Sequence, residues 1–377
     1  MSTDKLFTPL KIGDLQLAHR VIMAPLTRYR AENYLPGSLM ETYYSQRATP
    51  GGLLITEGTT ISSTAGLHPD SPRIDTAESI ESWRKVTNAV HDKGGYIFVQ
   101  LNHCGRSALS KFNDNQQPIS SSAIKQLGAP LNYEEDGLEF ELPREMTEAD
   151  MKNVISDFCK ASSNAMEAGF DGIELHSANG YLLDQFLEDN INSRTDMYGG
   201  TIENRCRFVL QVIDAICSQL GSSKVGVRIS PWDNFQGAND SDPLFHFGYL
   251  CEQLEKRSLA YVHIIEARSE SNGGLEKDDI KKVSLSKEVL KSSIPPLKKH
   301  LPTTPVFSAG GWNCNNFAGI LSETGIDGLA FGRYFISNPD LVHRLQYSAS
   351  LSKYDRATFY KHLSPVGYID YPLAVAR

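Results

Sequence analysis

Eight short runs of apolar and β-branched residues recur along the chain, and longer segments with helical periodicity separate them. The runs are Val21–Ala24, Leu53–Glu57, Tyr96–Gln100, Gly172–His176, Val225–Ile229, Tyr261–Ile265, Val306–Ala309 and Gly328–Phe331. Several are almost continuously apolar, as is typical of parallel strands that are buried on both faces. The pattern therefore predicts a parallel sheet.

Between the runs, apolar residues fall three and four positions apart, as they do in amphipathic helices. The expected helices are Ile80–Lys93, Glu148–Ala168, Ile202–Leu220, Phe245–Lys256 and Pro339–Leu345. Strand–helix alternation repeated eight times is the pattern of a (β/α)₈ TIM barrel. An open, doubly wound sheet is the alternative, but it rarely contains eight such units in order. We expect a barrel, with residues 1–377 forming one domain.

Two segments interrupt the alternation. Residues 103–147 are rich in Ser, Gln, Asn and Pro and follow the third expected strand. Loops of this length usually carry a function, so we expect a lid over the barrel mouth. Residues 266–283 follow the sixth expected strand, and we expect a mobile loop there.

Composition narrows the classes of partner. The net charge of −8 gives no basic footprint, so we expect no nucleic acid partner. No apolar run reaches about 18 residues, and none follows Met1, so we expect neither a membrane span nor a secretory signal. Six cysteines occur without CxxC spacing. We therefore expect no metal site and no disulfide framework, and a cytoplasmic location.

Polar or glycine residues follow seven of the apolar runs. In a TIM barrel the C-terminal strand ends meet at one face, where the chemistry takes place. The seven ends are Pro25-Leu26-Thr27-Arg28, Thr56-Glu57-Gly58, Gln100-Leu101-Asn102-His103, His176-Ser177-Ala178-Asn179, Arg228-Ile229-Ser230, Ser308-Ala309-Gly310-Gly311 and Gly332-Arg333. Seven such ends in register indicate the lining of one site.

The last two of these ends are suited to an anion. Gly310, Gly311 and Gly332 let backbone N–H groups approach a ligand, and Arg333 adds a guanidinium. TIM barrels often bind a phosphate at this place. Two tight turns with a solvated arginine are the alternative, which the residues alone leave open.

Arg228 stands between valine and isoleucine in the fifth expected strand, where an unpaired charge is costly. One interpretation is a buried ion pair with a barrel carboxylate, such as Glu57 or Glu266. The other is that Arg228 faces a cofactor ring that becomes negative.

The segment His176–Arg207, HSANGYLLDQFLEDNINSRTDMYGGTIENRCR, closely resembles the signature of the Old Yellow Enzyme family of flavoproteins. LFTPLKIGDLQLAHRVIMAPLTRYRA near the start, SPWDNFQG after the fifth strand and GLAFGRYFISNPDLVHRL at the eighth strand resemble it too. The resemblance extends from Leu6 to about Pro372. It implies an FMN-dependent ene-reductase with NADPH as reductant.

The resemblance also implies roles for individual residues. Pro25, Thr27, Gly58, Gln100 and Arg228 are expected to contact the flavin ring, and Gly310, Gly311, Gly332 and Arg333 its phosphate. His176 and Asn179 are expected to donate hydrogen bonds to the activating oxygen of the substrate. Tyr181 is expected to be the proton donor. Asn102, Phe359 and Tyr360 are expected to wall the substrate pocket.

This assignment suits the chemistry of reducing an alkene conjugated to a carbonyl or nitro group. Hydride added to the β-carbon moves negative charge onto the activating oxygen, where two donors stabilise it. Tyrosine, with an ordinary pKa of about 10, remains protonated at pH 7 and can donate to the α-carbon. Singly, however, a histidine at a strand end or a tyrosine before two leucines is more often structural.

No GxGxxG motif follows a strand, so we expect the nicotinamide to use the same pocket as the alkene in a ping-pong cycle. The expected substrates are enones, enals or nitroalkenes. A flavin oxidase or dehydrogenase, and a non-catalytic flavin- or phenol-binding sensor, are alternatives. Monomer and homodimer both remain open. Asn102 replaces a tryptophan found in many yeast relatives, which predicts a wider pocket.

Overall fold

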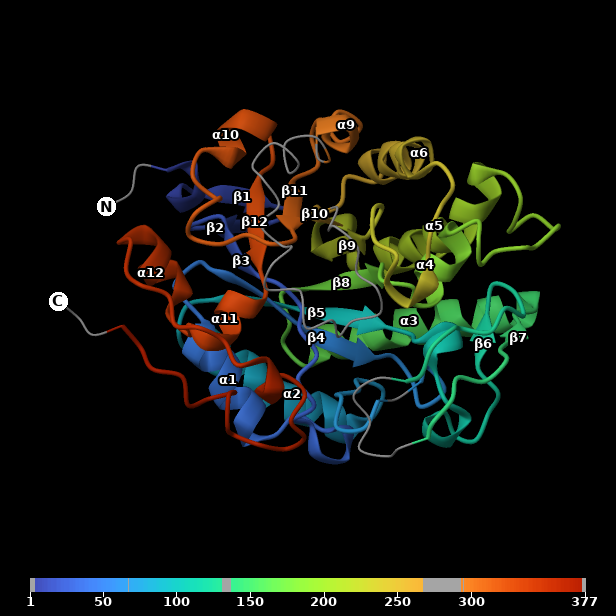
Figure 1. The fold of residues 1–377 in the computed structure, drawn as a ribbon, viewed down its shortest axis with the longest axis horizontal. Helices are drawn as coiled ribbons and strands as arrows, with labels where there is room; N and C mark the ends of the chain where they lie inside the picture. The colour runs from blue at the N-terminus through green and yellow to red at the C-terminus, as the bar shows by residue number, and fades with distance from the viewer. Residues whose placement is uncertain (1–3, 67, 131–136, 267–292, 294, 375–377) are drawn as a thin grey trace.

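Eight parallel strands close into a barrel in the computed structural model, which describes residues 4–66, 68–130, 137–266, 293 and 295–374 (Figure 1). In the order in which they pair around the barrel, the strands are β10 (Tyr261–Ile265), β11 (Val306–Ala309), β12 (Gly328–Phe331), β3 (Val21–Met23), β4 (Leu53–Thr60), β5 (Tyr96–Asn102), β8 (Gly172–Ser177) and β9 (Val225–Ile229). The eight predicted strands and the closed barrel are confirmed, and the open sheet is excluded.

Two strands extend at least two residues beyond their predicted ends. β4 continues to Thr60 and β5 to Asn102, because their pairing resumes at Gly58 after an irregularity between Ile55 and Gly58. A bulge of this kind re-aims the side chains that follow it. The polar ends of both strands are therefore part of the sheet and are fixed by its hydrogen bonds.

The four long helices between the strands were predicted, with small differences at their ends. They are α2 (Ala77–His91), α3 (Glu148–Glu167), α5 (Ile202–Leu220) and α6 (Pro243–Glu255). Each begins where an N-cap side chain accepts a backbone N–H, as hydroxyls and carboxylates do at this position. The caps are Thr76, Thr147, Thr201 and Asp242.

The shorter helices were largely not predicted. They are α1 (Ser38–Arg47), α4 (Leu182–Leu187), α9 (Pro295–Lys298), α10 (Ile320–Thr324) and α11 (Arg333–Ser337), whereas α12 (Leu341–Gln346) corresponds to the expected helix after the last strand. Helix α1 illustrates why these helices were not predicted. Its buried face includes Tyr43, Tyr44 and Arg47, so the sequence shows no apolar stripe there.

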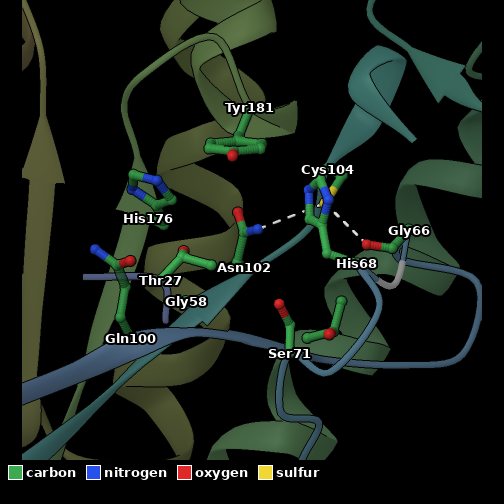
Figure 2. Close-up of a pocket in the computed structure, with 11 residues that line it drawn as sticks. Thr27, Gly58, Gly66, His68, Ser71, Gln100, Asn102, Cys104, His176 and Tyr181 are labelled. Atoms are coloured by element: carbon green, nitrogen blue, oxygen red, sulfur yellow. Dashed lines mark hydrogen bonds between the residues drawn. The ribbon is translucent and has the colours of Figure 1, made fainter. Parts of the chain in front are cut away.

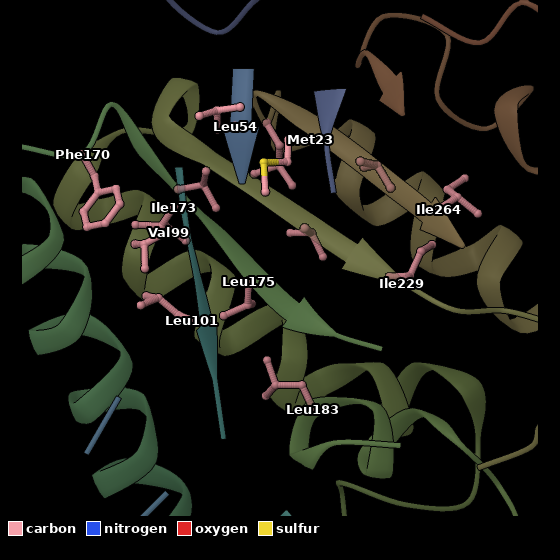
Figure 3. Packing of buried hydrophobic residues seen from close by; sticks show 14 of the residues in the cluster. Met23, Leu54, Val99, Leu101, Phe170, Ile173, Leu175, Leu183, Ile229 and Ile264 are labelled. Atoms are coloured by element: carbon pink, nitrogen blue, oxygen red, sulfur yellow. The ribbon is translucent and has the colours of Figure 1, made fainter. Parts of the chain in front are cut away.

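Alternation along the strands separates the barrel interior from its outer layer. Ile173 and Leu175 of β8 and Val99 and Leu101 of β5 point outward and pack beneath the helices (Figure 3). Their neighbours Phe98, Gln100, Glu174 and His176 therefore point inward, because successive side chains in a strand face opposite sides.

The barrel interior is built in layers. At its N-terminal end, the antiparallel hairpin of β1 (Leu10–Ile12) and β2 (Leu15–Leu17) packs into one apolar cluster with Phe98, Tyr261 and Phe307. The rings of Tyr261 and Phe307 stack at 4.4 Å. Polar side chains replace apolar ones in the next layer toward the C-terminal end, which is where the site lies.

The segment 103–147 is structured where it is described. It contains two short 3₁₀ turns, Gly105–Ser107 and Ser110–Phe112, and the strands β6 (Ile119–Ser120) and β7 (Arg144–Glu145), which pair in parallel. The Ser121 hydroxyl donates to the Gln185 carbonyl at 2.6 Å, which fastens the segment to α4. It borders the barrel mouth there. Except for Glu266, the loop expected at 266–283 lies outside the described residues.

No helix among the described residues is both long and apolar enough to cross a bilayer. In the same part of the chain, no cluster of His, Cys, Asp and Glu is arranged to hold a metal ion.

Candidate active site

A cavity opens at the C-terminal ends of β4, β5 and β8 (Figure 2). It unites six of the residues predicted for the site: Thr27, Gly58, Gln100, Asn102, His176 and Tyr181. Five further lining residues were not predicted: Thr60, Gly66, His68, Ser71 and Cys104. Most of these lie in the segment after β4 or just beyond β5, and no strand-end pattern marks them in the sequence.

A tight turn brings His176 and Tyr181 together. Asn179 and Gly180 adopt left-handed backbone conformations, with φ of 59° and 71°. The Asn179 N–H donates to the Ser230 hydroxyl and the Gly180 N–H to the Asp184 carboxylate, both at 2.8 Å. The chain thereby reverses before α4, and the rings of His176 and Tyr181 lie 5.1 Å apart.

Burial keeps both side chains neutral. It raises the pKa of the Tyr181 hydroxyl, as do Cys104 and Tyr360, while a hydrogen bond with Gln236 acts in the opposite direction. Burial, reinforced by Arg228 and His263, holds the pKa of His176 well below its usual value. A neutral imidazole and a protonated phenol are both hydrogen-bond donors, so the pair suits an oxygen acceptor.

His176 carries a further sign of a ligand. Its Nδ1 is buried and has no hydrogen-bond partner among the described residues. Buried polar atoms in native proteins are nearly always paired, so an orphaned one facing a cavity points to a bound group. Asn179, in contrast, is half-buried and does not belong to the side chains that line the cavity.

A polar layer lies under the cavity inside the barrel. The Gln100 amide donates to Glu174 Oε1, and the His263 Nδ1 lies next to Glu174 Oε2, both at 2.8 Å. Burial opposes the ionisation of Glu174, but His263 and Arg228 hold its pKa below the usual value. Burial, with Arg228, likewise lowers the pKa of His263. The pair is therefore a neutral imidazole donating to a carboxylate.

Arg228 belongs to this layer. It is paired in register with His176 on one side and His263 on the other. Its charge lowers the pKa of Glu174, so a barrel carboxylate does lie in its field, although it is not one of the two examples, Glu57 and Glu266, that we named from the sequence. Glu57 instead accepts the Arg28 N–H at 3.1 Å, and Glu266 accepts the hydroxyls of Ser293 and Ser308. Alternation along the strands explains why Glu174 lies in the field of Arg228, because both side chains face the barrel interior.

The glycines predicted to bind an anion follow the neighbouring strands β11 and β12. Gly310 has φ of 139°, and a Cβ there would lie 2.9 Å from the Glu266 Cβ, so only glycine fits. Gly332 immediately precedes α11, which begins at Arg333. Gly311, with φ of 89°, is exposed. The predicted phosphate-binding residues thus follow two adjacent strands of the barrel, and the phosphate site itself stays a prediction.

The C-terminal segment is fastened beside the barrel mouth. Arg28 donates to the carbonyls of Phe359 and Gly367 at 2.9 and 2.7 Å, and Arg30 donates to that of Thr358 at 3.0 Å. The ring of Tyr360 then lies 5.6 Å from that of Tyr29. Phe359 is buried and Tyr360 is partly exposed. Pro25 is buried directly after β3 and does not line the cavity.

The barrel and the site together define a class of protein, the flavin oxidoreductases built on a TIM barrel. The family described as NADH:flavin oxidoreductase / NADH oxidase matches residues 5–352. The chain therefore belongs to this FMN-binding family, whose members include the Old Yellow Enzymes.

Relatives and solved structures agree with this assignment. Flavin oxidoreductase hxnT of Emericella nidulans is 45% identical, with 98% of each chain covered. 12-Oxophytodienoate reductase 1 of Oryza sativa subsp. japonica is 41% identical over 97% of this chain and 92% of its own. A structure of morphinone reductase in complex with tetrahydroNAD superposes with a TM-score of 0.87 at 37% identity and 98% coverage of both chains. The Old Yellow Enzyme homologue from Zymomonas mobilis gives 0.89 at 34%, covering 98% of this chain and 100% of that one.

Proposed function

We propose that this chain is an NADPH-dependent ene-reductase that reduces alkenes activated by a carbonyl or nitro group. The observation that carries the proposal is the placement of His176 and Tyr181, 5.1 Å apart, over the same cavity as Thr27, Gly58 and Gln100. Two neutral donors of different chemistry at one cavity suit an oxygen that gains charge and a carbon that needs a proton.

The residues present fit FMN. Thr27, Gly58 and Gln100 line one cavity, and the buried Arg228 belongs to the polar layer under it, a set of donors that suits the polar edge of a flavin ring. Gly310, Gly311, Gly332 and Arg333 would hold its phosphate, and Pro25, Thr27, Gly58, Gln100 and Arg228 would contact its ring. When bound, FMN supplies the hydride that goes to the β-carbon of the alkene.

The chain's own residues supply the rest of the reaction. His176, with Asn179 beside it, donates a hydrogen bond to the activating oxygen and stabilises the charge that develops there. Tyr181 gives its proton to the α-carbon, assisted by Gln236, whose hydrogen bond lowers the pKa of the phenol. Asn102, Phe359 and Tyr360 bound the space in which the alkene is oriented.

We further propose that residues 1–377 form one FMN-binding domain.

The nicotinamide uses the same cavity before the alkene enters. The structure of morphinone reductase in complex with tetrahydroNAD supports direct binding of a nicotinamide, because a nicotinamide analogue binds that similar protein. The preference for NADPH over NADH comes from the resemblance to the family. It is tested by comparing the two reductants at equal concentration.

The experiment uses the purified holoenzyme without oxygen. NADPH is expected to bleach the flavin, and cyclohex-2-enone then to restore the colour with one equivalent of saturated ketone formed. Bleaching without recovery by any enone, enal or nitroalkene would favour an oxidase or dehydrogenase instead. A protein that binds FMN but is bleached by neither NADPH nor NADH would be a sensor.

A further inference from the structure

The end of the cavity beyond Asn102 contains two buried polar atoms with no role in the reaction described above. Figure 2 shows Ser71 and His68 on one side of Asn102, and His176, Thr27 and Gln100 on the other. Ser71 is 4% exposed and Asn102 is 8% exposed. Neither Ser71 Oγ nor Asn102 Oδ1 has a hydrogen-bond partner among the described residues.

The orientation of the Asn102 amide is set by its neighbour. The Cys104 thiol donates to the Gly66 carbonyl at 2.9 Å, so its sulfur is left to accept a hydrogen bond. The Asn102 Nδ2 lies 3.6 Å from that sulfur and donates to it. Oδ1 is thereby turned away from Cys104 and remains an acceptor in need of a donor (Figure 2).

This end of the cavity carries no charge. No lysine, arginine or carboxylate is among the residues that line the cavity. Burial lowers the pKa of the His68 imidazole to about 4, so His68 is neutral near pH 7. The Thr60 hydroxyl already donates to the Pro72 carbonyl at 3.2 Å. A carboxylate, phosphate or ammonium group would lose its hydration here without gaining a countercharge.

We propose that Ser71 and Asn102 form a subsite for a neutral hydroxyl group on the substrate. A hydroxyl can donate to Asn102 Oδ1 or accept from the Ser71 hydroxyl, and either contact satisfies a buried atom that has no partner among the described residues. The proposal rests on the proposed function and narrows its substrate class. The substrate is an activated alkene that also carries an uncharged hydroxyl group, away from the activating oxygen.

The subsite is tested first without turnover. Saturated ketones are titrated into the oxidised holoenzyme, and their dissociation constants are read from the change in flavin absorbance. The ligands are cyclohexanone and its 3- and 4-hydroxy, 3- and 4-methyl and 4-carboxy derivatives. At least one hydroxy isomer is expected to bind about tenfold more tightly than the methyl compound substituted at the same carbon, as one recovered hydrogen bond predicts. Equal binding of all hydroxy and methyl pairs would overturn the proposal, and tightest binding of the carboxylate would overturn the assigned chemistry.

A variant pair then locates the effect. Ser71→Ala is expected to abolish the preference for hydroxyl over methyl, measured as the ratio of the two dissociation constants within the same variant. Ser63→Ala is the matched control, because this serine in the same segment is part-exposed and its hydroxyl donates to Asp114. A preference that survives in Ser71→Ala would contradict the subsite. If that variant does not retain FMN, the wild-type comparison of hydroxyl and methyl ligands decides alone.

The corresponding enones separate this inference from the proposed function. Hydroxycyclohex-2-enones should show the same tenfold preference in kcat/KM over their methyl analogues. If no enone is reduced while the saturated hydroxy ketones still bind preferentially, ene-reduction fails and the subsite stands. If enones are reduced without any hydroxyl preference, ene-reduction stands and the subsite fails.

Discussion

The Glu174 carboxylate lies 2.8 Å from Nδ1 of His263, inside the barrel and directly under the candidate site. Both side chains are fully buried. The same carboxylate accepts the amide of Gln100 and lies in the field of Arg228. One negative charge therefore orients the Gln100 amide and partly offsets the positive charge of Arg228, and both residues are expected to contact the flavin.

Glu174→Gln is predicted to raise the reduction potential of bound FMN. Removing the carboxylate takes away a negative charge close to the expected flavin ring and in the field of Arg228, which favours the more negative reduced cofactor. A tenfold change in the ratio of affinities for the reduced and oxidised forms corresponds to about 30 mV for this two-electron couple. The midpoint potential is measured by dye-linked titration. Exposed Glu167→Gln is the control, and an unchanged potential in an FMN-loaded Glu174→Gln protein would contradict the prediction.

Gly180→Ala is predicted to destabilise the fold and to slow reoxidation by enone. A Cβ at this position would lie 2.9 Å from both the Gln236 Cβ and the Phe235 carbonyl oxygen, at a φ of 71°. Gly200→Ala is the matched control, because Gly200 has a φ of 80° with nothing within 4 Å of the added Cβ. Strain alone costs about 1 kcal/mol in the control, and the clash should bring Gly180→Ala to about 3 kcal/mol. Equal losses in urea unfolding would show that the contact is relieved elsewhere.

Asn102→Trp is predicted to change the stereochemical outcome for a bulky enone. Asn102 lines the cavity between Cys104 and the His176 side, so an indole there would fill the space on one side of the alkene. The enantiomeric ratio of the product is measured by chiral chromatography, with cyclohex-2-enone turnover as a check on the variant. An unchanged ratio would mean that the alkene does not lie against residue 102.

The rate of reoxidation by cyclohex-2-enone is predicted to be flat between about pH 6 and pH 9. The lowered pKa of His176 keeps the imidazole neutral throughout, since the group is deprotonated above its own pKa. The raised pKa of Tyr181 keeps the phenol protonated over the same range, because it lies above the ordinary value of about 10. Stopped-flow rates across the range check this. An inflection near pH 6.5 would show that His176 titrates as an ordinary, solvated histidine.

The sequence predicted the barrel because strands buried on both faces must be apolar over their whole length. It also predicted Thr27, Gly58, Gln100, Asn102, His176 and Tyr181, which follow or end such strands and meet in one cavity. Ser71 and His68 could not be predicted in this way. Their place depends on the path of the chain after β4, which local patterning does not determine.

The carboxylate near Arg228 shows a second limit of prediction from the sequence. Glu174 lies two residues before His176, so alternation along the strand predicts that both side chains face the barrel interior. The choice among carboxylates depends on which strands are neighbours and in what register. Only the closed order β5, β8, β9, β10 shows that Glu174, Arg228 and His263 share one layer.

The most direct test of the account is the pair of half-reactions of Tyr181→Phe. Tyr181 is assigned the proton for the α-carbon and no part in accepting hydride from NADPH. The variant should therefore be bleached by NADPH at nearly the wild-type rate, while its reoxidation by cyclohex-2-enone slows by about 100-fold or more. Reoxidation at the wild-type rate would contradict the assignment of Tyr181, and with it the proposed division of roles between Tyr181 and His176.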